Sequence, residues 1–87
     1  MNDTFTLIFE LNALGYRVAF DQKRASGEWR AEVWVYNHSW FLRGSATSNS
    51  LYFALKMAVQ RAKSKAGHNW ESDGRESLRL QKELNAR

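Results

Sequence analysis

The side chains that carry most enzyme chemistry are few in this sequence, and their spacing favours no reaction. There is no Cys, which excludes disulfides, thiol chemistry and Cys-ligated zinc. His38 and His68 lie far apart and outside any HExxH pattern, so no metal site is expected. Ser45, Ser48 and Ser50 precede an expected helix, where hydroxyls cap free N–H groups, and no GxSxG motif surrounds them. We therefore expect a protein that is not an enzyme and that binds no metal or cofactor.

Arginines and aromatic rings interleave on one face of an expected sheet and form a first candidate site. Such side chains can contact phosphates and stack on bases. This interpretation makes the chain a small nucleic-acid-binding module that uses Arg17, Arg30, Arg43, Trp34 and Tyr36, with Phe41 on the same face. Glu32 in the middle of this face disfavours phosphate. The alternative, which we expect, is that a helix covers the face and its rings belong to the core, because the opposite face is also apolar.

A basic helix end with neighbouring rings forms a second candidate site, for a protein partner. This hypothesis assigns partner binding to Lys56, Arg61, Lys63, Lys65, Tyr52 and Trp70. The cations would speed encounter with an acidic surface, and buried rings would slow dissociation. Cations at a helix C-terminus also complement the helix dipole without any ligand. Phe53 and Met57 would extend the surface unless a C-terminal helix packs on them, which we expect.

The positive charge is concentrated in the middle of the chain. The net charge is +4, from 13 Lys and Arg against 9 Asp and Glu. Residues 33–70 hold five basic and no acidic side chains, whereas residues 1–32 hold four and five, and residues 71–87 four of each. A region of one sign attracts phosphate, anionic lipid or an acidic protein.

Periodicity predicts a single α+β domain. Eighty-seven residues suit one domain. Helical spacing of apolar residues, period-two alternation and turn residues predict a three-stranded antiparallel meander packed by helices, in the order α-β-β-β-α plus a short C-terminal helix. The expected helices span 4–14, 50–65 and from about 74 onward, and the expected strands span 16–22, 28–36 and 40–45. We expect a domain at 1–70 and a helical extension at 71–87.

Composition also suggests where the protein works. The sequence has no run of about 18 apolar residues, so we expect no membrane span. The absence of Cys and of a signal-peptide pattern at the N-terminus favours the cytoplasm. A monomer and a homodimer are both compatible with the sequence.

The order of elements resembles that of the double-stranded-RNA-binding domain. Phe41-Leu42-Arg43-Gly44-Ser45-Ala46-Thr47-Ser48, followed by Ala54, Ala58 and Ala62, is similar to that family's last strand and alanine-rich second helix. The family places lysines at the N-terminus of that helix to grip phosphates. This sequence has Ser48-Asn49-Ser50-Leu51 there, so the resemblance implies the fold and not the RNA binding.

A second resemblance is to small phage and prophage accessory proteins of the anti-CRISPR type. It is carried by Trp29, Trp34 and Trp40, the segment Gly44–Ser48 and the segment Leu55–Ala62. Such proteins bind a host complex and obstruct it without an active site. The resemblance implies a phage-type inhibitor in the host cytoplasm, whose partner is a host protein or ribonucleoprotein complex with an acidic surface. We expect this function, with the nucleic-acid-binding module as the alternative.

Overall fold

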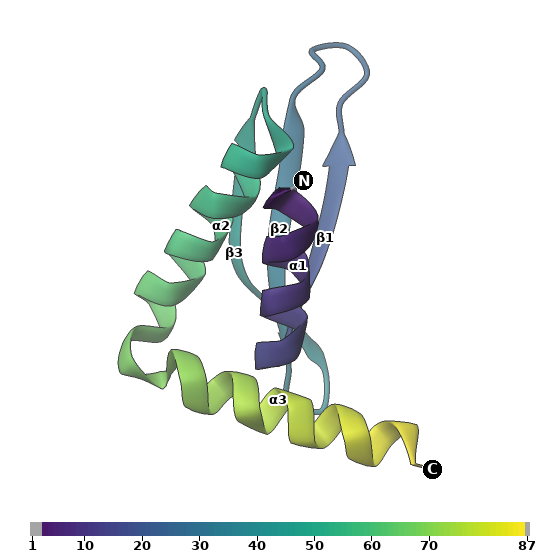
Figure 1. The fold of residues 1–87 in the computed structure, drawn as a ribbon, viewed down its shortest axis with the longest axis vertical. Helices are drawn as coiled ribbons and strands as arrows, with labels where there is room; N and C mark the ends of the chain where they lie inside the picture. The colour runs from purple at the N-terminus through teal and green to yellow at the C-terminus, as the bar shows by residue number, and fades with distance from the viewer. Residues whose placement is uncertain (1–2, 87) are drawn as a thin grey trace.

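The computed structural model describes residues 3–86 and confirms the predicted α+β fold (Figure 1). A helix precedes three strands, and two long helices joined by a short 3-10 helix follow them. The bounds are α1 Asp3–Leu14, β1 Tyr16–Gln22, β2 Trp29–Tyr36, β3 Trp40–Ser48, α2 Leu51–Ala66, η1 Gly67–Asn69 and α3 Trp70–Asn85. Within the described chain, no helix is long and apolar enough to cross a membrane.

The three strands form one antiparallel sheet in the order β1-β2-β3. Figure 1 shows α1 and α2 side by side on the same face of this sheet, while α3 crosses one end of it. Ala31, Val33 and Val35 of β2 point toward the helices and are buried, and Leu11 and Leu55 pack against them. The core is therefore one layer between the sheet and two helices.

Small residues let α2 lie very close to β3. Ala54, Ala58 and Ala62 of α2 are fully buried, and they face Gly44 and Ala46 of β3. A Cβ atom on Gly44 would lie 2.2 Å from the carbonyl oxygen of Ala58, which no side chain tolerates. This close packing confirms the alanine stripe that the sequence predicts for α2. Ser50 caps this helix as expected, since its Oγ accepts from the N–H of Phe53.

A buried polar clasp holds α3 against the rest of the domain. Ser77 Oγ donates to the Gly15 carbonyl at 2.6 Å and accepts from the Tyr36 N–H at 2.9 Å. Gln81 Nε2 donates to the same Gly15 carbonyl at 3.2 Å and to Ser77 Oγ at 3.0 Å. Gln81 Oε1 in turn accepts from two guanidinium nitrogens of Arg17, at 3.2 and 3.3 Å. The clasp ties α3 to the start of β1 and the end of β2.

The last helix differs from its prediction in length and position. It begins at Trp70, four residues before Gly74, because η1 joins it directly to α2. It crosses the end of the sheet and does not cover Phe53 and Met57, which remain 59% and 37% exposed. The expectation that this helix packs on Phe53 and Met57 is therefore wrong. The short 3-10 helix η1 instead directs α3 across the end of the sheet, away from the outer side of α2.

Candidate functional site

The face of the sheet opposite the helices is bare. Ala19 and Arg30 on this face are exposed, and Trp34 and Tyr36 are half-buried, whereas the helix-side residues of β2 are fully covered. The expectation that a helix covers this face is wrong. The reason is topological: the single residue Gly15 connects α1 to β1 and leaves α1 on the other face, while α3 continues from α2 across the end.

Four apolar side chains gather on this bare face and form what we call the sheet-face patch: Trp34, Tyr36, Trp40 and Leu42. The strand register places them together, because Tyr36 pairs with Trp40 and Trp34 pairs with Leu42. The Tyr36 and Trp40 rings are in contact, with centroids 5.1 Å apart. Trp40 is 40% exposed and Leu42 36% exposed. Exposed apolar side chains gathered on one surface mark an interaction site more often than single ones do.

The predicted composition of this face is wrong for β3. Phe41 pairs with Val35 and therefore lies on the side of the helices. The cause is the connection at residues 37–39, which has three residues with His38 in the left-handed region at φ 64°. A connection of three residues places Trp40 opposite Tyr36. Trp40 and Leu42 therefore share a face with Tyr36, whereas the prediction put Phe41 on that face.

Arg43 also leaves the face, because it is the extra residue of a β-bulge. Leu42 pairs with Trp34 and Gly44 pairs with Val33, so Arg43 has no partner in the register. Its side chain lines a small cavity of about 40 Å³ with Asp73 and Glu76 of α3. The structure thus brings Arg17, Arg30, Trp34 and Tyr36 onto one face and separates Arg43 from them. The bulge also turns Gly44 toward α2, as the close packing requires.

Charges on the bare face balance. Arg30 Nε lies 3.2 Å from the Glu32 carboxylate, and Trp34 Nε1 donates to the other Glu32 oxygen at 3.4 Å. In the strand register, Asp21 lies opposite Arg30 and Arg17 lies opposite Trp34, on the same face. The face therefore holds two arginines and two carboxylates, which sum to no net charge, and the Arg17 guanidinium is bound to Gln81. A neutral face does not attract a polyanion over a distance.

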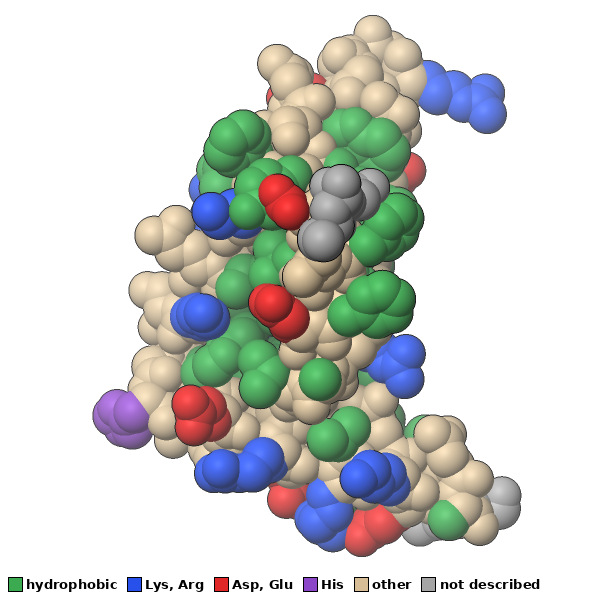
Figure 2. Space-filling model, viewed as in Figure 1, with side chains coloured by type: hydrophobic (Ala, Val, Ile, Leu, Met, Phe, Trp, Pro, Cys, Tyr) green, Lys and Arg blue, Asp and Glu red, His purple; other side chains and the backbone are tan. Residues whose placement is uncertain are grey.

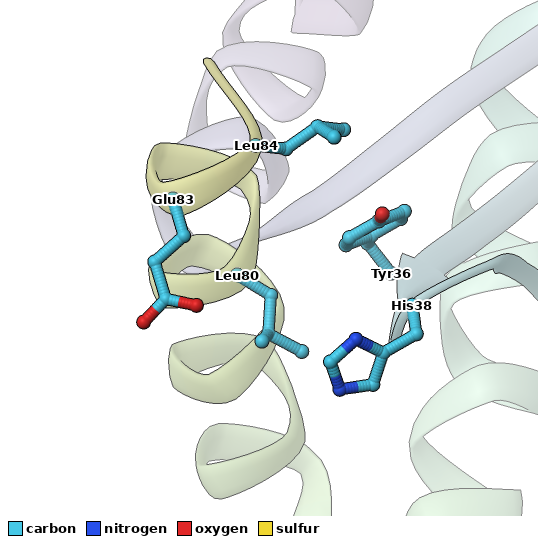
Figure 3. Close-up of a pocket in the computed structure, with 5 residues that line it drawn as sticks. All are labelled: Tyr36, His38, Leu80, Glu83 and Leu84. Carbon is cyan, nitrogen blue, oxygen red and sulfur yellow. The ribbon is translucent and has the colours of Figure 1, made fainter. Parts of the chain in front are cut away.

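The patch continues onto α3 at one end of the sheet. Figure 3 shows the Tyr36 ring and His38 opposite Leu80 and Leu84 of α3, while the Glu83 side chain extends away from them. The hollow between them holds about 70 Å³, too small for a ligand. Leu84 is 48% exposed and extends the apolar surface past the end of the strands.

The predicted basic surface on α2 is divided between two sides of the helix. Arg61 lies at the edge of β3, where its Nη1 donates to the Ser45 carbonyl at 2.7 Å. Lys56 lies on the opposite side, in a depression shared with the carboxylates of Asp3 and Glu10. Figure 2 shows Lys and Arg side chains standing apart on this side of the molecule, with Asp and Glu between them. The structure therefore does not bring these cations together into one docking surface.

Trp70 is half-buried and packs against the core. Its ring stacks on Tyr16, with centroids 3.9 Å apart and an interplanar angle of 10°. The Tyr16 hydroxyl donates to the Trp70 carbonyl at 2.6 Å. Burial, with a smaller contribution from Asp73, raises the pKa of Tyr16 to about 12, so its hydroxyl remains a donor at neutral pH. Lys63 lies over the outer side of the Trp70 ring, 5.7 Å from its centroid.

The remaining predicted partner-binding residues lie on the surface without forming a cluster. Tyr52 is half-buried, with Lys56 Nζ 5.3 Å from its ring centroid. Lys65 is exposed near the end of α2. Sequence reasoning missed Trp40 and Leu42 as members of a site. The signal that could have identified them is the three-residue connection before β3, whose odd length sets the parity of the strand.

The described residues hold no group of three or more His, Asp or Glu side chains that could bind a metal ion. No family model matches the chain, and comparisons with curated proteins and with solved structures find no significant match.

Proposed function

We propose that this chain is a non-catalytic protein-binding domain that docks its partner on the sheet-face patch. The observation that carries the proposal is the bare sheet face, on which Trp34, Tyr36, Trp40 and Leu42 meet beside balanced charges. Protein interfaces combine an apolar, aromatic-rich centre with a polar rim, and Trp, Tyr and Arg are their most frequent hot spots. Arg17 would supply part of that rim.

A sheet-bound surface suits tight docking for a physical reason. The rings of Tyr36 and Trp40 pack against each other, and the Trp34 indole N–H donates a hydrogen bond to Glu32. Rings that are already ordered lose little conformational entropy on binding, so more of the contact energy remains as affinity. The partner that fits is a protein surface with an apolar centre and charges of both signs at its rim.

The first test places a photoreactive amino acid in the patch. We expect the chain with benzoylphenylalanine in place of Trp40 to crosslink in its native cell to a second protein. Phe53 on α2 is the matched control, because it is also aromatic and, at 59%, is more exposed than Trp40. Adducts should come from position 40 and not from position 53.

The same pair of positions then tests the purified complex. Trp40→Ala should raise the dissociation constant about thirtyfold, the effect of losing a typical hot spot, and Phe53→Ala should change it less than about twofold. Adducts from position 53 alone would contradict the proposal and favour the surface around Phe53 and Met57. Isothermal titration calorimetry or surface plasmon resonance measures both dissociation constants.

For the identity of the partner, the proposal rests on the resemblance to phage accessory proteins. It makes the partner a host complex that handles nucleic acid, obstructed by the bound domain. Because the bare face around the patch carries no net charge, its partner does not need a strongly acidic surface. Inhibition of such a complex by the purified chain, lost in Trp40→Ala, is the result that this hypothesis requires.

A nucleic-acid-binding module is the second candidate, because Arg17, Arg30, Trp34 and Tyr36 do share one open face. Rings on an open sheet can stack on unpaired bases while arginines contact phosphates. Against it, Asp21 and Glu32 occupy the same face, and Arg30 is already paired with Glu32.

Salt dependence tests this second candidate. If Arg17 and Arg30 each neutralise one phosphate of a single strand, affinity should fall about sevenfold between 50 and 200 mM salt. Fluorescence anisotropy with labelled single-stranded DNA and RNA measures it, and Arg17→Ala should roughly halve the slope. Arg75→Ala, an exposed position on α3, is the control. No binding at 50 mM salt would rule this candidate out.

A further inference from the structure

The two edges of the sheet differ in how well they are protected. On β3, the bulge at Arg43 interrupts the ladder, and Arg61 occupies the Ser45 carbonyl. On β1, seven residues run without a bulge or proline, and no described residue outside β2 forms a hydrogen bond to the backbone of Val18 or Phe20. A regular, unprotected edge is a template for another strand.

The register of β1 shows which of its backbone groups are free. Lys23 N–H donates to the carbonyl of Glu28, the residue before β2, so the N–H of residue 23 points toward the β2 side of the strand. Hydrogen-bonded pairs alternate along an antiparallel ladder, and odd-numbered residues of β1 therefore bond to β2. Val18 and Phe20 direct their N–H and C=O groups outward, where they are available to a partner strand.

The charges of β1 are symmetric about its central residue. Arg17 and Asp21 lie two positions on either side of Ala19, on the same bare face. In an antiparallel pair of two β1 strands centred on Ala19, each Arg17 meets the Asp21 of the other copy. The same register places Val18 opposite Phe20, so the outward backbone groups bond to each other. A pattern that complements itself points to a second copy rather than to a foreign strand.

The flank of α1 above this edge is apolar and unpartnered. Asp3, Thr6, Leu7 and Glu10 face α2. Phe5 and Phe9 lie one turn apart on another side of the helix and are 55% and 71% exposed. Figure 2 shows hydrophobic side chains gathered along the side of α1 that is away from α2. Two copies joined at β1 would bring these flanks together.

We propose that two copies of this chain pair their β1 strands antiparallel, centred on Ala19, to form a continuous six-stranded sheet. The Arg17–Asp21 pairs fix the register on the bare face, and Phe5 and Phe9 of both copies bury one another above it. This association is separate from partner docking, because it leaves the sheet-face patch free. It places two copies of the patch on one uninterrupted surface, so the dimer docks two partner molecules or one two-fold partner.

A charge-swap experiment tests the register directly. Sedimentation equilibrium of the full chain should give twice the 10.1 kDa chain mass. Arg17→Asp and Asp21→Arg each place like charges opposite each other twice, and each should raise the dimer dissociation constant at least about tenfold. Arg17→Asp also removes the hydrogen bonds to Gln81 Oε1, so the loss in Asp21→Arg and the recovery in the mixture carry the test. Mixed in equal amounts, the two variants form only opposite pairs, so the dimer should return as a heterodimer.

Two controls keep the result specific. Glu10→Arg makes the same charge change as Asp21→Arg on the α2 side of α1 and should leave the dimer intact. Trp40→Ala should also leave it intact, since the patch lies outside this interface. Far-UV circular dichroism confirms that each variant is folded. A mass of 10.1 kDa at every concentration, a dimer lost in Trp40→Ala, or no recovery in the mixture would overturn the proposal. The presence or absence of the dimer does not decide whether the patch binds another protein, and Asp21→Arg is the variant to use for that comparison, because Arg17 also lies at the rim of the patch.

Discussion

Gly15→Ala should destabilise the fold by roughly 3–5 kcal/mol. Gly15 has φ +104°, a conformation that an L side chain adopts only under strain. A Cβ atom there would also lie 1.9 Å from the carbonyl oxygen of Gly74, in the backbone of α3. Stability on the order of 5–10 kcal/mol is usual for a domain of this size, so most of it would be lost. Urea denaturation followed by far-UV circular dichroism measures the change.

Two other glycines separate strain from collision. Gly27 has φ +74° with nothing within 4 Å of an added Cβ, so Gly27→Ala should cost only strain, about 1 kcal/mol. Gly74 lies inside α3, and its Cβ would meet the Leu14 carbonyl oxygen at 2.2 Å, so Gly74→Ala should cost only the collision. Equal losses for Gly15 and Gly27 would show that α3 does not press on the α1–β1 turn.

Trp70→Ala should also destabilise the fold, with a loss of about 2–4 kcal/mol. The substitution removes the ring stacked on Tyr16 and the surface that Lys63 covers. Trp40→Ala is the matched control, since it removes the same side chain from the bare sheet face and should cost less than about 1 kcal/mol. Circular dichroism is the suitable probe, because each substitution removes a fluorophore.

The two tryptophans also separate folding from binding. Trp40→Ala is expected to remain folded and to lose its partner, while Trp70→Ala is expected to lose stability. Equal destabilisation by the two would contradict the packing of Trp70 against the core. If the Trp70→Ala variant is stable but does not bind the partner, Trp70 belongs to the docking surface, as the sequence predicted.

Most of the fold could be predicted from local pattern. Alternation in β1 and β2 placed Tyr16 and Val33 correctly, because period two is a direct consequence of strand geometry. The alanine stripe identified α2 and its buried face, since small residues at helical spacing pack closely against a sheet. These features depend on neighbours in the chain and need no tertiary information.

The candidate site was predicted less well, because it depends on relations between elements. Arg17, Arg30, Trp34 and Tyr36 were placed on one face correctly, but Arg43 was not. The bulge at Arg43 and the three-residue connection before β3 decide which face of the sheet each β3 side chain occupies. Composition alone reveals neither of them. Whether a face is covered depends on where the last helix goes, and a three-residue connection decides that.

The clasp between α3 and the sheet constrains a segment that is usually free to vary. The ladder between β1 and β2 ends at Gly15, the residue before β1. There Ser77 Oγ of α3 accepts the Tyr36 N–H and donates to the Gly15 carbonyl, so the helix links the two segments where the strands no longer bond directly. One residue added to Gly67–Asn69 would rotate Ser77 by about 100° and carry it off that hydrogen bond. The length of this short connection is therefore as firmly determined by the fold as that of a tight hairpin turn, although its residues lie on the surface.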